Sequence, residues 1–264
     1  MHEIADIACN FTSDRFDNDL DEVIDRAIAN HITKFGLICS RLRDIDKLLE
    51  IYNRYSKNMF FTIGVHPHHA NEINTEYLEK LKEVINKNNP HAIGETGLDF
   101  FRNLSTYEEQ MYAFEEQIKI AIDTNKPLFL HQRDSHEDFI KILRKYSSDI
   151  SKAAVHCFTG TQKQLDDYLE LDCYIGVTGW ICDEKRNVEL RKTIKNIPLS
   201  KLMIETDCPY LIPKNLLDKP KNNRNEPSYL NHIVTEISIL LDTDEEDIRK
   251  ESFKNTLSFF QSVN

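Results

Sequence analysis

The chain has 264 residues, of which 40% are hydrophobic and 29% charged, so it contains enough apolar side chains for a folded core. Its formal net charge of −11 argues against a broad basic surface for double-stranded DNA. The N-terminus lacks a basic start and an apolar stretch, and no apolar run approaches the roughly 18–20 residues of a membrane helix. We therefore expect a soluble, cytoplasmic protein that does not act at a membrane.

The cysteines do not form a recognisable metal or redox motif. None of the six belongs to a CxxC pair, which disfavours a zinc ribbon and a thioredoxin-type site. Cys39 ends the apolar run Phe35-Gly36-Leu37-Ile38-Cys39, which contains no basic residue to stabilise a thiolate. We expect buried free thiols and no disulfides.

Short runs of β-branched and aromatic residues alternate with segments of helical periodicity along the whole chain. In the first helical segment, Leu20, Val23, Ile24, Ala27 and Ile28 follow the i, i+3, i+4, i+7, i+8 spacing of one buried face. The predicted strands span residues 4–10, 34–39, 60–65, 92–97, 127–131, 153–157, 174–178 and 202–206. Eight such strand–helix units predict an α/β fold, a TIM (β/α)8 barrel that forms a single domain over residues 1–264.

Helix starts and glycine usage agree with this fold. Three sequence pairs fit capping boxes, in which side chains bond to the first free amides of a helix: Ser105 with Glu108, Thr161 with Gln164, and Thr243 with Glu246. An open, doubly wound sheet is the competing fold, but the chain has only seven glycines and no GxGxxG or P-loop motif.

Polar residues that can bind a metal follow five of the predicted strands. They are His66, Glu95, His131, His156 and Asp207, each at or near the carboxyl end of its strand. In a TIM barrel all these ends meet at the face that carries the active site. Two of these imidazoles and the two carboxylates together form a mixed nitrogen and oxygen ligand set for a divalent cation. A purely structural cluster is less favoured, because Glu95 and Asp207 would repel each other without a cation.

The motifs around these residues resemble the successive signatures of TatD-type metal-dependent deoxyribonucleases. They occur in order and span most of the chain: Gly64-x-His66-Pro67, Gly94-Glu95-x-Gly97-Leu98-Asp99, His131-x-Arg133-Asp134, His156-Cys157-Phe158-Thr159-Gly160, Glu205-Thr206-Asp207-x-Pro209-Tyr210 and Arg224-Asn225-Glu226-Pro227. The resemblance implies a metal-dependent hydrolase barrel that hydrolyses DNA, with a role in DNA repair or DNA degradation. It also implies that the metal-site residues are Glu95, His131, His156 and Asp207.

The first strand departs from many relatives, which carry His-x-His after an Asp. Here Asp6 is followed by Ala8 and Asn10 at the two histidine positions, a pattern similar to the subgroup that includes the TatD proteins proper. We expect one metal position, served by Glu95 and its histidine partners, to be retained. The other, near Asp207, should be weaker and richer in oxygen ligands, which suits Mg²⁺ better than Zn²⁺. Mg²⁺ is therefore the expected ion, with Mn²⁺ or Zn²⁺ as alternatives.

Further roles for these residues can be predicted from the steps that phosphodiester hydrolysis requires. Asp207 is the predicted metal ligand and general base, and Glu95 shares the catalytic metal site. His66 is expected either to contact the phosphate or protonate the leaving oxygen, or to be a structural loop residue. Arg133 and Arg224 are predicted to bind substrate phosphates, with a structural ion pair as the alternative for each.

The acidic composition favours single strands or frayed 3′ ends over internal duplex sites, because few phosphate contacts suffice there. The predicted activity is a 3′–5′ exonuclease. His68 and His69 are predicted to be loop residues without a partner, and the protein is expected to be a monomer. Two rival functions remain. One is a metal-dependent hydrolase of an amide or ester on the same barrel, and the other is a non-enzymatic scaffold.

Overall fold

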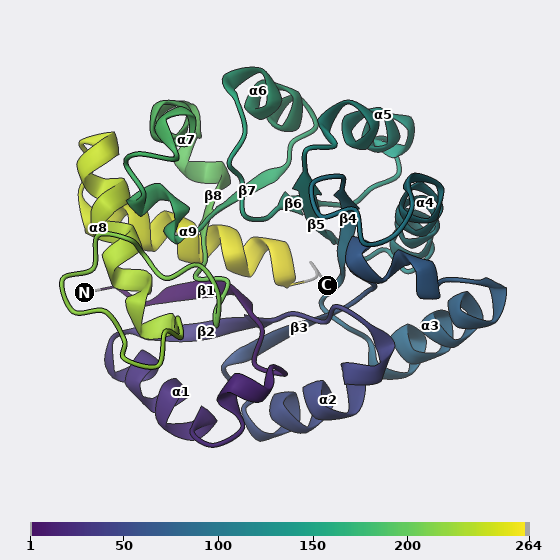
Figure 1. Cartoon of the computed structure of the whole chain (residues 1–264), viewed down its shortest axis with the longest axis horizontal. Coiled ribbons are helices and arrows are strands. Elements are labelled where there is room, and N and C mark those ends of the chain that lie inside the picture. Colours follow the sequence, from purple (N-terminus) through teal and green to yellow (C-terminus); the bar gives the residue numbers. More distant parts are fainter. Residues whose placement is uncertain (1, 262–264) are drawn as a thin grey trace.

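The computed structural model describes residues 2–261, whose strands form one parallel eight-stranded barrel (Figure 1). The strands are β1 (Ile4–Cys9), β2 (Ile32–Leu37), β3 (Met59–Ile63), β4 (Ala92–Asp99), β5 (Leu128–Arg133), β6 (Ala153–Val155), β7 (Tyr174–Val177) and β8 (Leu202–Ile204). They lie in sequence order and each pairs in parallel with the next. The predicted TIM barrel is confirmed, and every predicted strand end lies within two residues of the observed end.

The two edges of the sheet meet just beyond β8. Cys9, at the end of β1, forms a parallel bridge with Cys208, and the Asn10 amide donates to the Cys208 carbonyl oxygen at 2.8 Å. This contact closes the barrel at its carboxyl end. Asn10 and Asp207 are thereby brought together, although they belong to opposite ends of the sequence.

Helices surround the barrel, as expected for right-handed β–α–β crossovers (Figure 1). They are α1 (Leu20–Ala29), α2 (Ile45–Arg54), α3 (Thr75–Asn88), α4 (Tyr107–Asp123), α5 (His136–Tyr146), α6 (Gln162–Glu170), α7 (Val188–Thr193), α8 (Leu230–Leu241) and α9 (Glu245–Phe260). Within residues 2–261, none of these helices is long and apolar enough to cross a bilayer.

One of the three predicted capping boxes is confirmed, at Thr161 and Gln164. For α4 the box lies one residue later than predicted, because Thr106 Oγ1 accepts from the Glu109 amide and Glu109 Oε2 accepts from the Thr106 amide. For α9 the prediction was wrong as well, since Asp244, and not Thr243, caps the helix. Neighbouring polar residues compete for such positions, so the sequence pattern leaves an uncertainty of one residue.

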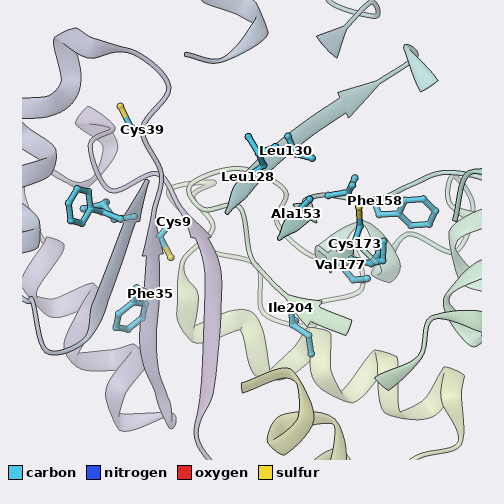
Figure 2. Close-up of a cluster of buried hydrophobic side chains, with 14 of the residues drawn as sticks. Cys9, Phe35, Cys39, Leu128, Leu130, Ala153, Phe158, Cys173, Val177 and Ile204 are labelled. Atoms are coloured by element: carbon cyan, nitrogen blue, oxygen red, sulfur yellow. The ribbon is translucent and has the colours of Figure 1, made fainter. Parts of the chain in front are cut away.

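Alternate residues of each strand face two different buried layers. Leu128 and Leu130 point outward and belong to the larger apolar cluster between the sheet and the helices, part of which Figure 2 shows. Phe129 belongs to a smaller cluster with Phe60 and Phe260. The rings of Phe60 and Phe260 stack with centroids 4.9 Å apart, so the end of α9 packs against residues from the barrel strands.

This smaller cluster supports the functional end of the barrel. The Phe129 ring stacks against the imidazole of His156, with ring centroids 5.2 Å apart. Phe129 and His131 lie two residues apart on β5, and therefore on the same side of the strand. An apolar aromatic layer thus lies directly beside the polar residues at the carboxyl ends of the strands.

Candidate active site

A cleft of about 1000 Å³ lies at the carboxyl ends of the strands. Its lining includes all five residues that sequence patterns placed at strand ends: His66, Glu95, His131, His156 and Asp207. The expected convergence of these side chains is therefore confirmed. What each of them does chemically depends on their mutual geometry.

Glu95 lies at the centre of the cluster and its side chain is largely buried. One of its carboxylate oxygens, Oε1, lies 2.7 Å from His156 Nε2, 3.0 Å from His131 Nδ1 and 3.3 Å from His66 Nε2. Three imidazoles from the ends of three different strands therefore surround a single carboxylate oxygen. Such crowding of ring nitrogens around one anionic oxygen is typical of a site prepared for a cation.

Burial and the neighbouring charges set the protonation states at this centre. Burial by itself raises the pKa of Glu95, but the surrounding imidazoles, His66 and His156 above all, hold this pKa well below its usual range. Burial also lowers the pKa of His66 to about 4, so its imidazole is neutral near pH 7. A neutral imidazole is a good metal ligand and a poor proton donor.

Asp99 holds the outer side of His131. Its Oδ2 lies 3.3 Å from His131 Nε2 and 2.7 Å from His68 Nε2. Burial would raise the pKa of Asp99, but its bonds to His131 and His68 lower this pKa instead. The prediction that His68 lacks a partner was therefore wrong, and His69 also has one, since its Nδ1 lies 3.6 Å from Glu72.

Glu205 lies behind His156 in the same way. Its Oε1 accepts from the Cys157 amide, and its Oε2 lies 3.5 Å from His156 Nδ1. His156 Nδ1 and Glu205 Oε2 are both buried and face each other in this ion pair, without a hydrogen bond to any described residue. The His156 ring is oriented with Nε2 towards Glu95, 2.7 Å from Glu95 Oε1. Carboxylates that bind the far nitrogen of a ligating histidine are a common feature of metal sites.

Asp207 lies at the opposite edge of the cluster, after β8. Its Oδ1 accepts a hydrogen bond from Asn10 Nδ2 at 2.9 Å. Burial raises the pKa of Asp207 to about 7, and the charges of Glu95 and Glu205 act in the same direction. A carboxylate with a pKa near neutrality can exchange protons at physiological pH.

Asp6, which lies in β1 before Ala8 and Asn10, does not reach the cleft. It is fully buried and accepts from the Thr206 amide at 2.9 Å and from the Thr206 hydroxyl. It lies beside Cys9 and Cys208, and burial raises the pKa of both thiols. Asp6 therefore connects the first and last strands, and the neighbouring thiols stay protonated, as expected for buried free cysteines.

The two arginines predicted to bind phosphate lie in different environments. Arg133 is exposed at the rim of the cleft, with its guanidinium carbon 3.9 Å from the centroid of the Phe101 ring. Arg224 is buried outside the cleft, and its two terminal nitrogens each bind the Asp19 carboxylate at 2.6 Å. The structure therefore brings Arg133 to the site but not Arg224, which forms the kind of structural ion pair considered as its alternative.

The residues present fit a divalent cation. One ligand atom from each of His66, Glu95 and His131 lies within 4.8 Å of the other two, giving two nitrogens and one oxygen. His156 and Asp207 border the same space and add a further nitrogen and oxygen. Sequence patterns did not identify Asp99, Glu205 and Asn10 as partners of these residues, although Asp99 and Glu205 lie within the quoted motifs.

A protein-family model described as TatD related DNase matches residues 5–261 of the chain. The chain belongs to the TatD family. The protein of Salmonella typhimurium named 3′-5′ ssDNA/RNA exonuclease TatD is 38% identical over 258 residues, which cover 98% of this chain and 99% of that protein. A protein of the same name from Escherichia fergusonii is 42% identical over 233 residues, or 88% of this chain and 89% of that protein.

Solved structures of TatD-type proteins have the same architecture. The crystal structure of a TatD family hydrolase from Entamoeba histolytica superposes with a TM-score of 0.88 at 30% identity, covering 98% of each chain. YjjV, a TatD homologue from Escherichia coli K12, superposes with a TM-score of 0.89 at 24% identity over 97% of each chain, which supports the fold alone.

Proposed function

We propose that this TatD-family chain is a metal-dependent 3′–5′ exonuclease that acts on single-stranded nucleic acid, with the whole chain forming one catalytic domain. The observation that carries the proposal is the cluster around Glu95 Oε1, where three imidazole nitrogens approach within 2.7–3.3 Å at the floor of a cleft. Relatives that match nearly the whole chain carry the name 3′-5′ ssDNA/RNA exonuclease, which supports the reaction and the substrate class.

We assign the metal site to Glu95, His131, His156 and Asp207, together with His66, which the geometry adds. A bound divalent cation lowers the pKa of a coordinated water and neutralises charge on a nonbridging phosphoryl oxygen. Mg²⁺ is the favoured ion at the side near Asp207, which has no first-strand histidines. Mn²⁺ and Zn²⁺ are alternatives, because three imidazoles, those of His66, His131 and His156, surround the side near Glu95.

The chain's own residues then handle the proton and the phosphate. Asp207 Oδ1 is held by Asn10, so Oδ2 remains to accept the proton of the attacking water. The water oxygen bonds to phosphorus, the bond from phosphorus to the leaving sugar oxygen breaks, and that oxygen takes up a proton from solvent water. Arg133, at the rim, is placed to bind a phosphate through its forked donors. His66 is assigned to the metal site and not to proton donation, because it contacts Glu95 directly.

The substrate preference follows from charge. With a net charge of −11, the surface as a whole repels a polyanion, so binding depends on the cleft and its immediate surroundings. A single strand with a free end can enter such a cleft, whereas the interior of a duplex cannot present its backbone to the floor of the site. We therefore place single-stranded ends ahead of duplex DNA as substrates.

The test is a cleavage assay with a 5′-labelled single-stranded oligonucleotide after removal of metal with EDTA. Added Mg²⁺ should produce a ladder that shortens from the 3′ end, and the duplex form should react more slowly. His131→Ala and Asp207→Asn should abolish the ladder, whereas Asp149→Asn, an exposed carboxylate in the loop before β6, should leave it unchanged. Metal-independent cleavage, or faster cleavage inside the duplex, would overturn the proposal.

A further inference from the structure

A second hollow of about 320 Å³ adjoins the cleft beside the segments that follow β7 and β8. The two hollows share the side chains of Trp180, Arg186, Tyr210 and Leu211 in their linings. The four shared side chains therefore lie between the cleft and the second hollow. The volume of the second hollow lies at the lower end of the range for small-molecule sites.

The second hollow is positively charged, which is unusual in a chain with a net charge of −11. Its lining contains Arg15, Arg186 and Lys214, and no carboxylate among the described residues. The Arg15 guanidinium donates to the carbonyl oxygens of Pro209 at 3.2 Å and Asn223 at 2.6 Å, so it is held in place without being neutralised. Arg186 Nε lies 3.8 Å from the Asp183 carboxylate, which offsets part of its charge, whereas no ion pair of Lys214 occurs within residues 2–261. These features favour an anionic ligand.

The loop that borders this hollow continues the positive charge. Residues 214–223 contain Lys214, Lys219 and Lys221 and only one acid, Asp218, which gives three positive charges minus one negative, or +2. This is part of the green loop that leads into α8 in Figure 1. Arg15 holds the end of the loop against the barrel through Asn223.

Aromatic side chains separate the second hollow from the catalytic cluster. Tyr210 is 54% exposed, and its amide donates to the Asp207 carbonyl oxygen at 2.9 Å, so it stands directly beside the predicted general base. Trp180 lines both hollows with it. Exposed aromatic rings beside basic side chains are the usual means of binding single strands, because every base offers a face for stacking.

Arg224 supports the lining of the second hollow indirectly, through Arg15. It donates to the Arg15 carbonyl oxygen at 2.6 Å while its guanidinium binds Asp19. Arg15 in turn binds the segment after β8 and the lysine-bearing loop. Arg224 is therefore a positioning residue for the second hollow.

We propose that the second hollow and the 214–223 loop bind the part of the strand that lies 5′ to the cleaved bond, with a base against Tyr210 and backbone phosphates beside Arg186 and Lys214. This inference rests on the proposed function. The 3′-terminal nucleotide ends inside the cleft, whereas the rest of the strand must leave towards solvent. The carboxylate-free hollow and the basic loop offer a route of matching charge for that departing strand.

The test compares substrates of different length with one set of variants. We would measure kcat/KM in Mg²⁺ for bis(4-nitrophenyl) phosphate, which reaches only the catalytic cluster, and for the oligothymidylates dT2 and dT8. Lys214→Gln with Lys221→Gln removes one charge from the hollow and one from the loop, and neither residue lines the catalytic cleft. Lys195→Gln removes one charge from an exposed position in the 3₁₀ turn Ile194–Asn196, just after α7, and serves as the control.

Wild-type protein should prefer dT8 to dT2. The double variant should lose about tenfold in kcat/KM on dT8 and be unchanged on dT2 and on bis(4-nitrophenyl) phosphate, because only the longer strand reaches the hollow. The slope of log KM against log salt should become shallower by roughly 0.7 for each lost phosphate contact. Tyr210→Leu should cost about tenfold on dT8 through lost stacking. Lys195→Gln should match wild type throughout.

Other outcomes separate the two proposals. An equal loss on dT2 and dT8 would mean that the hollow holds the terminal nucleotide, which overturns the assignment to the departing strand. Wild-type cleavage of dT2 and dT8 with no loss in any variant would overturn the inference and leave the exonuclease proposal intact. If wild-type protein hydrolyses none of the three substrates, both proposals fail. Melting temperatures equal to wild type would establish that each variant is folded.

Discussion

Asn10 Nδ2 donates a hydrogen bond to Asp207 Oδ1 at 2.9 Å, and the same nitrogen donates to the Cys208 carbonyl oxygen at 3.1 Å. The first strand and the last strand of the barrel are thereby joined at the candidate catalytic centre. The Asn10 side chain therefore orients the Asp207 carboxylate through a hydrogen bond.

Replacing Asn10 tests this positioning role. Asn10→Ala should lower kcat by about tenfold, because a hydrogen bond to a carboxylate contributes roughly 1.5–3 kcal/mol. KM should change little, because Asn10 acts on Asp207 and not on the substrate. Asn196→Ala, which removes an exposed amide bonded to Gln162, is the control. A change in KM alone, with kcat preserved, would assign Asn10 to substrate binding instead.

Metal content provides a second test. After dialysis, the protein should retain fewer than two zinc ions per chain by elemental analysis, because the first strand carries Ala8 and is followed by Asn10, so it offers no imidazole ligand on the side near Asp207. His131→Asn should lose at least about tenfold in metal affinity, given that changes to partners of metal ligands already cost 10–100-fold. His31→Asn is a matched control, because His31 is exposed and adopts a positive φ that Asn tolerates. Two tightly held zinc ions would contradict this expectation.

The architecture could be predicted because it depends on local alternation. Each strand is a short apolar run followed by a helical pattern, and eight repeats of that unit leave few possible folds. The pairing register inside a strand could not be predicted. In β4 the register shifts between Ile93 and Thr96, next to Glu95, and no sequence pattern signals this shift.

Partners distant in sequence could not be predicted. His68 and Asp99 are 31 residues apart, and Arg224 and Asp19 are 205 residues apart, so no local spacing connects them. One signal was present, however. Asp99 follows Glu95 by four residues on a strand, an even spacing that places both on the same side when the strand is regular. That even spacing indicates Asp99 as a companion of Glu95 at the metal site.

The two arginines should respond differently to the same substitution. Arg133→Met should leave the free energy of unfolding unchanged, because the side chain is exposed, and should lower kcat/KM by about tenfold through a lost phosphate contact. Arg224→Met should cost about 2 kcal/mol of stability, because it leaves the Asp19 carboxylate without its partner. Urea unfolding and steady-state kinetics on the same samples would measure both. If Arg224→Met lowered kcat/KM and Arg133→Met lowered stability, Arg224 would be assigned to phosphate binding instead.

The burial of His91, which lies outside the candidate active site, predicts that the stability of the protein depends on pH. Its ring lies among those of Tyr52, Phe60 and Phe61, and its Nδ1 accepts from the Phe61 amide at 3.2 Å. Burial, with a contribution from the charge of Lys126, lowers the pKa of His91 to about 4, against 6.5 for the ordinary side chain. The folded protein therefore holds the neutral imidazole.

The sign of the effect follows from proton binding. Between pH 6.5 and about 4 the unfolded chain binds a proton at His91 and the folded chain does not. The contribution of neutral His91 to the free energy of unfolding is therefore complete above pH 6.5 and is lost as the pH falls through this window. His91→Gln removes the titrating group and keeps an oxygen to accept from Phe61. Urea unfolding from pH 7.5 to 4.5, in EDTA so that metal loss does not contribute, should show wild-type protein losing more stability than the variant. Parallel curves for the two proteins would show that His91 titrates equally in the folded and unfolded states.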